Sequence, residues 1–213
     1  MARAPLTTRR LLGLDRSGGP PPETRKGEPL NPWTIPNAIG FVRLALLPVF
    51  VYLAFDTDDG RSTAAVIVFA VVAWSDYADG MAARITGQYS RLGALLDPIT
   101  DRALVITGAV VCWHFELLPR WALAVLAARE LAMLLLGQVA LRHNLDLNIN
   151  MLGRWAVWPT MSALFFAMVT DDAWPEYLLY VGLAMTIGAT VIYFRDGIRE
   201  LRKRDSSKAS TSR

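Results

Sequence analysis

The stretch from residue 76 to residue 101, DYADGMAARITGQYSRLGALLDPITD, places four aspartates inside sequence that is otherwise apolar enough to lie in a membrane. Asp76 and Asp79 interrupt one apolar run, and Asp97 and Asp101 interrupt the next. An ionised side chain at the centre of a membrane helix costs about 2.5–3.5 kcal/mol even on the gentler insertion scales. Four carboxylates this close together therefore require a common partner.

The rest of the chain has the composition of a multi-pass membrane protein. Of its 213 residues, 53% are hydrophobic and 19% are charged, whereas about 25% of residues are charged in an average soluble domain. The segments 1–32 and 202–213 are polar and basic, and we expect them to be disordered tails. This distribution excludes an ordinary soluble globule and a disordered chain, and the single cysteine excludes a disulfide scaffold.

Residues 33–201 predict one all-α integral membrane domain with six transmembrane helices. A membrane span needs about 20 predominantly apolar residues. Six stretches have roughly that length: Thr34–Phe55, Ser62–Ala83, Leu92–His114, Trp121–Leu141, Met151–Val169 and Trp174–Phe194.

The charges outside these stretches predict how the domain is oriented in the cell membrane. Aspartates dominate the loops after the first and fifth stretches, whereas arginines mark the loops after the second and fourth. Because arginine and lysine favour the cytoplasmic side, we expect both termini to be cytoplasmic. The net charge of +3 is explained by the same anchoring, and the apolar middle leaves no soluble basic face for a nucleic acid.

Helical spacing places the four carboxylates on two stripes. At about 100° per residue, the polar and small residues of the second span fall within an arc of about 140°. They are Asp76, Asp79, Gly80, Ala83 and Arg84. Gly93, Asp97 and Asp101 are spaced four residues apart and form a narrower stripe on the third span. The two spans have a short connection, so we expect antiparallel neighbours whose stripes can face each other.

Charge favours divalent metal ions as the common partner of the carboxylates. Four carboxylates carry −4, which two divalent cations neutralise, and oxygen-only ligation suits Mg²⁺ or Mn²⁺. The small residues Gly80, Ala83 and Gly93 have two interpretations, since they either allow close helix packing or leave room for a large ligand. Arg84 is either a topology charge or a cation for a pyrophosphate.

The motif Asp76-x2-Asp79-Gly80-x2-Ala83-Arg84-x8-Gly93-x3-Asp97-x3-Asp101 matches in full the signature of the CDP-alcohol phosphatidyltransferases. The chain resembles this family over nearly the whole membrane region, including Ile35-Pro36-Asn37 and Arg43 in the first span. Members of the family are membrane enzymes of six helices that use an alcohol to displace CMP from a CDP-linked lipid. The resemblance implies a polar, metal-containing cavity at the cytoplasmic side and an assembly as a homodimer.

The resemblance also implies roles for individual residues. Asp76, Asp79 and Asp97 would bind the metal ions, and Asp101 would be the general base and a further metal ligand. The implied CDP-lipid site comprises Asn37, Gly80, Ala83, Arg84, Ser90 and Gly93. We expect CDP-diacylglycerol and an alcohol as substrates, and two Mg²⁺ or Mn²⁺ ions as cofactors.

The acceptor alcohol is less sharply indicated. Segments 34–48 and 90–98 resemble the bacterial enzymes that make phosphatidylglycerophosphate or cardiolipin. Phosphatidylglycerophosphate synthases usually have Lys-x-Lys-Thr at the start of the fifth span, where this chain has Gly153-Arg154-Trp155. The chain is more similar to the CMP-forming cardiolipin synthases, so we expect phosphatidylglycerol as the acceptor, glycerol 3-phosphate as the alternative and inositol phosphate third.

Two further polar positions and one different class of function stay open. In one interpretation, Arg129 forms an ion pair with Glu130, and Arg154 is a cytoplasmic loop charge that orients the protein in the membrane. In the other, Arg129 and Arg154 hold the phosphate of the acceptor. A transporter or proton relay also places carboxylates inside spans. It would not need small residues and an arginine at these fixed offsets, and the chain shows no repeated halves.

Overall fold

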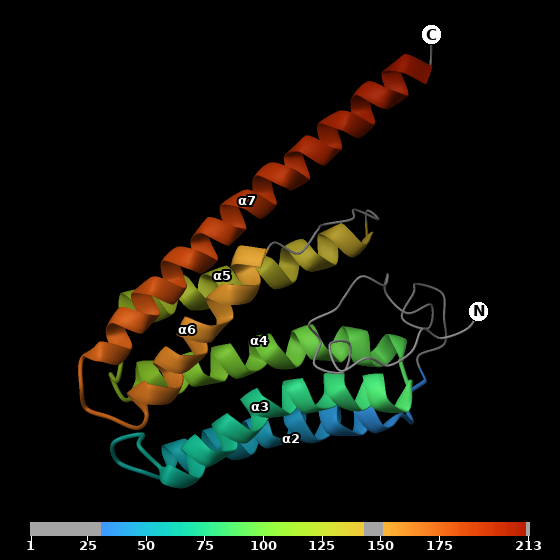
Figure 1. The fold of residues 1–213 in the computed structure, drawn as a ribbon. Helices are drawn as coiled ribbons and strands as arrows, with labels where there is room; N and C mark the ends of the chain where they lie inside the picture. The colour runs from blue at the N-terminus through green and yellow to red at the C-terminus, as the bar shows by residue number, and fades with distance from the viewer. Residues whose placement is uncertain (1–30, 143–150, 212–213) are drawn as a thin grey trace. The chain divides into compact units, whose positions relative to one another are not determined.

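The computed structural model describes residues 31–142 and 151–211, and within these residues it contains six helices and no strands. The helices are α2 (Ile35–Phe55), α3 (Thr63–Thr86), α4 (Arg91–His114), α5 (Arg120–Arg142), α6 (Met151–Ala167) and α7 (Trp174–Thr211), as Figure 1 shows. The predicted all-α class is confirmed. α7 continues as a helix through residues that composition predicts to be part of the C-terminal tail, whereas residues 1–30 lie outside the described part of the chain.

Three of the described segments are long and apolar enough to cross a membrane: Ile35–Phe55, Thr63–Ala83 and Trp174–Ile192. Large apolar side chains on their outer faces are exposed, among them Val49, Ile67 and Val181, as expected for helices in contact with lipid. α4 is not among these segments, and Asp97, Asp101 and Arg102 interrupt its apolar sequence. The membrane character is therefore clear, and the number of six spans stays a prediction.

The chain forms two compact units, Met1–Thr107 and Gly108–Arg213. In the first unit α2 and α3 run antiparallel, side by side (Figure 1), and the rings of Phe50 and Phe69 contact each other between them at a centroid distance of 5.3 Å. Each helix begins at a hydroxyl cap: the side chain of Thr34 accepts from the Asn37 amide, and that of Ser62 accepts from the Ala65 amide. These caps satisfy amides that a helix start leaves open.

α3 ends where the chain turns toward α4. Gly87 follows the last helical residue with φ of 65°, a left-handed conformation that glycine adopts without the steric cost of a side chain. The next two residues lead to Ser90, which precedes the start of α4. This turn brings Ser90 beside the start of α2, where its hydroxyl hydrogen-bonds the Asn37 side chain.

In the second unit, α7 packs along α6 and also contacts α5. Gly182 of α7 faces Thr160 of α6 so closely that a β-carbon at Gly182 would lie 2.9 Å from the Thr160 backbone nitrogen. Small residues allow such close approach between membrane helices, where van der Waals packing drives association. Trp121 of α5 stacks on Tyr180 of α7 at a ring-centroid distance of 5.4 Å.

Candidate active site

Two of the four predicted carboxylates meet at one arginine in the first unit. Arg43 lies in the middle of α2, and its side chain is only 1% exposed. Its Nη1 donates to Oδ1 of Asp76 on α3 at 3.2 Å, and its Nη2 donates to Oδ1 of Asp101 on α4 at 2.8 Å. One residue from each of the two predicted stripes thus contacts the same guanidinium, which comes from the first span.

The two carboxylate side chains are much more exposed than the arginine side chain. The side chains of Asp76 and Asp101 are 49% and 47% exposed, whereas the guanidinium beneath them is buried. Hydrogen bonds between ionised partners are shorter and about twice as strong as neutral ones, and a buried guanidinium needs such partners. The result is a fixed cation under two carboxylates that remain reachable.

Spacing along the sequence does not reveal this role of Arg43, although the sequence contains a signal for it. An arginine within an apolar span is as costly as an aspartate there and needs an acidic partner. The sequence contains such partners on the next two spans, but helical spacing alone does not say which helix lies beside them. Only the packing of α2 against α3 and the two ion pairs identify the contact.

The remaining members of the predicted metal site are described only in part. Asp97 lies on α4 one helical turn before Asp101, and Gly80 and Ala83 lie on α3. The side chains of Asp79 and Arg84 lie outside what the structure describes. Among the described side chains, no three His, Cys, Asp or Glu residues form a group that could hold a metal ion. The Asp76 and Asp101 carboxylates, which meet at Arg43, are nevertheless oxygen donors of the kind that Mg²⁺ and Mn²⁺ prefer.

Asn37, Ser90 and Gly93 form a hydrogen-bonded link between the starts of α2 and α4. The Ser90 hydroxyl donates to Oδ1 of Asn37 at 2.7 Å and accepts from the Gly93 amide at 2.9 Å. The Asn37 side-chain nitrogen donates to the carbonyls of Asn31 and Pro32. Both Asn37 and Ser90 are buried. The polar groups expected to contact CDP are thus engaged within the protein, and their contact with CDP stays a prediction.

Gly93 has a packing role in this link. A β-carbon at Gly93 would lie 2.8 Å from Oδ1 of Asn37 and 3.2 Å from Oγ of Ser90, closer than side chains pack. The absence of a side chain at Gly93 therefore makes room for the Asn37–Ser90 hydrogen bond. Of the two interpretations of Gly93, close packing is the one with a visible contact.

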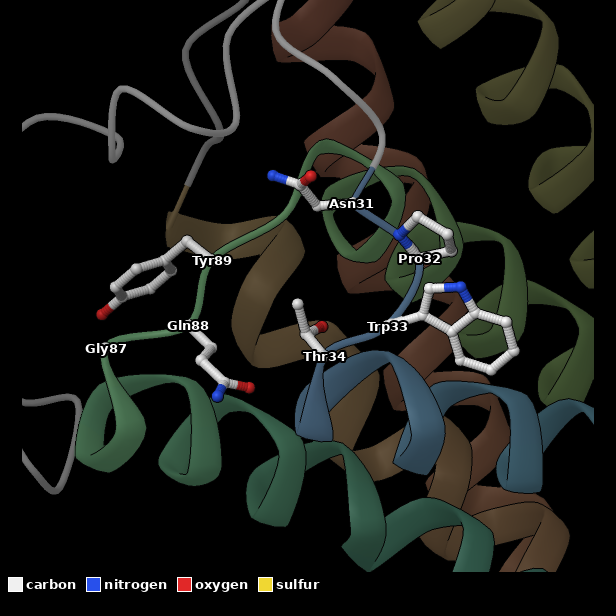
Figure 2. Close-up of a pocket in the computed structure, with 7 residues that line it drawn as sticks. All are labelled: Asn31, Pro32, Trp33, Thr34, Gly87, Gln88 and Tyr89. Atoms are coloured by element: carbon white, nitrogen blue, oxygen red, sulfur yellow. The ribbon is translucent and has the colours of Figure 1, made fainter.

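A cavity of about 390 Å³ lies next to this link. Its lining comes from the residues just before α2 and the turn after α3: Asn31, Pro32, Trp33, Thr34, Gly87, Gln88 and Tyr89. In Figure 2, Thr34 and Gln88 lie between the rings of Trp33 and Tyr89. The Gln88 side chain accepts from the Ile35 amide at 3.0 Å, which ties the turn to the start of α2. The volume of the cavity falls within the range of small-ligand pockets, about 300–1,000 Å³.

Arg129, an expected acceptor residue, lies in the second unit with its guanidinium engaged. It forms an ion pair with its neighbour Glu130, and its Nε donates to Oγ1 of Thr190 at 3.3 Å. The Arg129 and Glu130 side chains are largely buried. The structure thus contains the ion pair that was one of the two interpretations. The side chain of Arg154 lies outside the described residues.

The part of the chain that carries the four aspartates is similar to known proteins. The sequence model of the family described as CDP-alcohol phosphatidyltransferase matches residues 33–188. A Streptomyces coelicolor protein named "Cardiolipin synthase (CMP-forming)" is 34% identical over 171 residues, covering 78% of this chain and 80% of that protein. Two proteins named "CDP-diacylglycerol--glycerol-3-phosphate 3-phosphatidyltransferase" are also similar. The one from Bacillus subtilis is 29% identical over 62% of this chain and 75% of its own length, and the one from Shigella flexneri is 30% identical over 75% and 88%.

The Asn37–Ser90 link predicts the effect of one substitution on stability. Ser90→Ala removes the donor to Asn37 and the acceptor for the Gly93 amide, and a buried polar group without a partner costs about 1–3 kcal/mol. We expect the thermal unfolding midpoint of the detergent-solubilised protein, measured without substrate, to fall. The matched control is Ser75→Ala, because the Ser75 hydroxyl donates only to the Val72 carbonyl of its own helix. Equal midpoints for both variants would show that the link contributes nothing.

Proposed function

Since the chain belongs to the CDP-alcohol phosphatidyltransferase family, we propose that it transfers the phosphatidyl group of CDP-diacylglycerol to the hydroxyl of phosphatidylglycerol, forming cardiolipin and CMP. The family membership makes the protein a phosphatidyltransferase of phospholipid synthesis. The observation that carries the proposal at the site is the convergence of the Asp76 and Asp101 carboxylates, half-exposed, on the buried Arg43. The 34% identity with the Streptomyces coelicolor protein supports phosphatidylglycerol as the acceptor.

In the proposed reaction Asp101 is the general base. The hydroxyl of the acceptor is a poor nucleophile until a base removes its proton in the transition state, and a positioned carboxylate contributes about 10²–10⁴-fold in this way. The Asp101 carboxylate is 47% exposed, so an acceptor can reach it, and its contact with Arg43 orients it. The alcohol oxygen then attacks the phosphorus of the phosphatidyl group, and the bond to the CMP oxygen breaks.

The divalent ions belong to the proposal, and the Asp76 and Asp101 carboxylates at Arg43 support it as donors of the right kind. Asp76, Asp79, Asp97 and Asp101 would hold two Mg²⁺ or Mn²⁺ ions. Such ions, when bound, stabilise the charge that develops on a leaving phosphate and hold the phosphorus for in-line attack. The residues at the adjoining ends of α2, α3 and α4 would bind the CDP group: Asn37, Gly80, Ala83, Arg84, Ser90 and Gly93. The neighbouring cavity supports this position, since its lining includes Asn31 and Pro32, whose carbonyls accept from Asn37, and Tyr89, which precedes Ser90.

Glycerol 3-phosphate is the second candidate acceptor, and inositol phosphate is the third. The Bacillus subtilis and Shigella flexneri relatives carry a name that specifies glycerol 3-phosphate, at lower identity than the Streptomyces coelicolor protein. Arg129 and Arg154 are the proposed contacts for an acceptor phosphate. The Arg129 guanidinium already contacts Glu130 and Thr190. An acceptor phosphate would therefore bind Arg129 alongside these two side chains.

We place the enzyme in the cell membrane with six spans, both termini in the cytoplasm and the site at the cytoplasmic side. The three apolar helices support the membrane location, and the alternation of acidic and basic loops supports the orientation. Assembly as a homodimer is part of the same proposal and follows from the family.

An acceptor experiment tests the proposed reaction. Purified protein is supplied with CDP-diacylglycerol and Mn²⁺, and phosphatidylglycerol, glycerol 3-phosphate or inositol phosphate is added separately. We expect CMP release with phosphatidylglycerol, and mass spectrometry should identify the lipid product as cardiolipin. Release with glycerol 3-phosphate alone would transfer the assignment to the second candidate. If no acceptor led to CMP release, the proposal that the protein is an enzyme would be contradicted. That result is the one expected of a transporter.

The assignment of Asp101 as base predicts a separation of binding from turnover. Asp101→Asn keeps an oxygen that can accept from Arg43 but cannot take a proton, so we expect CMP release to fall about 10²–10⁴-fold. Binding of CDP-diacylglycerol, measured by equilibrium filtration, should change little. The control is Asp58→Asn, in the exposed loop between α2 and α3, which should retain full activity. Near-normal turnover of Asp101→Asn would refute the assignment.

A further inference from the structure

Arg43 is a charged side chain to which the proposed reaction assigns only the orientation of Asp101. It lies within a 21-residue apolar helix, it is 1% exposed, and both of its acidic partners come from other helices. Keeping a guanidinium at this place requires partners with good geometry, because the cost of removing its charge from water is several kcal/mol. A side chain maintained at such a cost in contact with two site residues calls for a functional explanation.

The shape of the guanidinium explains why an arginine occupies this position. Its nitrogens form a rigid planar fork, and two of them each hold one carboxylate: Nη1 holds Asp76 and Nη2 holds Asp101. Because the two nitrogens belong to one rigid group, they fix the separation of the two Oδ1 atoms that they contact. A lysine ammonium carries the same charge on a flexible stem and lacks this fork.

The one-sided burial separates this arrangement from an ion pair that serves folding alone. The cation is buried, whereas each carboxylate is about half exposed. The two acids are thus accessible from outside the protein, whereas the arginine that holds them is not. Residues that hydrogen-bond metal-binding carboxylates from behind orient them and commonly affect metal affinity 10–100-fold.

We propose that Arg43 is a positioning residue that holds the carboxylates of Asp76 and Asp101 at the separation required to bind a divalent cation. The inference rests on the proposed function, in which these two aspartates are metal ligands. It concerns the protein before any lipid substrate is bound, since the contacts exist within the chain alone. The positive charge of Arg43 opposes a metal ion, so the proposal requires that orientation outweigh repulsion.

Mn²⁺ binding to the full-length protein in detergent, without substrate, tests the proposal. Electron paramagnetic resonance of free Mn²⁺ gives the affinity of the wild type and of Arg43→Lys and Arg43→Gln. We expect both variants to bind Mn²⁺ 10–100-fold more weakly. The control is Arg120→Lys, because Arg120 is exposed and pairs with the exposed Glu116; its Mn²⁺ affinity should equal that of the wild type.

Each alternative result has a defined meaning. Unchanged Mn²⁺ affinity in a folded Arg43→Lys, or tighter binding in Arg43→Gln, would overturn the positioning role and leave Arg43 as a cation that only opposes the metal. Failure of both variants to fold, judged by gel filtration and circular dichroism, would assign Arg43 a structural role and also overturn it. CMP release by the wild type is measured in the same preparation, so that a failed proposed function is recognised independently of the Arg43 result.

Discussion

The ion pairs of Arg43 with Asp76 and Asp101 are the contact on which the account of this site depends. They join α2, α3 and α4 at one point in the first unit, and they resolve a physical difficulty in the sequence. Charged side chains within apolar helices are unfavourable unless they are paired. Here the arginine of one helix and the aspartates of two others satisfy one another, with the cation buried and the acids accessible.

Two further features arrange the site around this contact. The Ser90–Asn37 hydrogen bond links the starts of α2 and α4, and the left-handed Gly87 lets the chain turn from α3 toward Ser90. Together they place a cavity at the ends of the helices that carry the carboxylates. A CDP-linked lipid suits such a place, because its acyl chains can stay in the membrane while its nucleotide lies among polar groups.

Apolar stretches of spanning length predicted where the six described helices lie, although α7 continues to Thr211, beyond the expected end at Phe194. The second stretch was expected over Ser62–Ala83, and α3 covers Thr63–Thr86. Helical spacing also predicted that the stripes of Asp76 and Asp101 could meet, and both contact Arg43. The identity of that partner was not predictable, because spacing within a helix carries no information about its neighbours. The hydrogen bond between Asn37 and Ser90 joins residues 53 positions apart. Without knowledge of this bond, the missing side chain at Gly93 suits a ligand and close packing equally.

We propose that the carboxylates held by Arg43 form the metal-binding part of a phosphatidyltransferase site. Anomalous diffraction from crystals grown with Mn²⁺ and CDP-diacylglycerol tests it most directly. The account predicts Mn²⁺ peaks at the Asp76 and Asp101 carboxylates, with the CDP phosphates beside them and the contacts to Arg43 retained. Mn²⁺ bound away from these aspartates, or carboxylates that leave Arg43 when the ion binds, would contradict it.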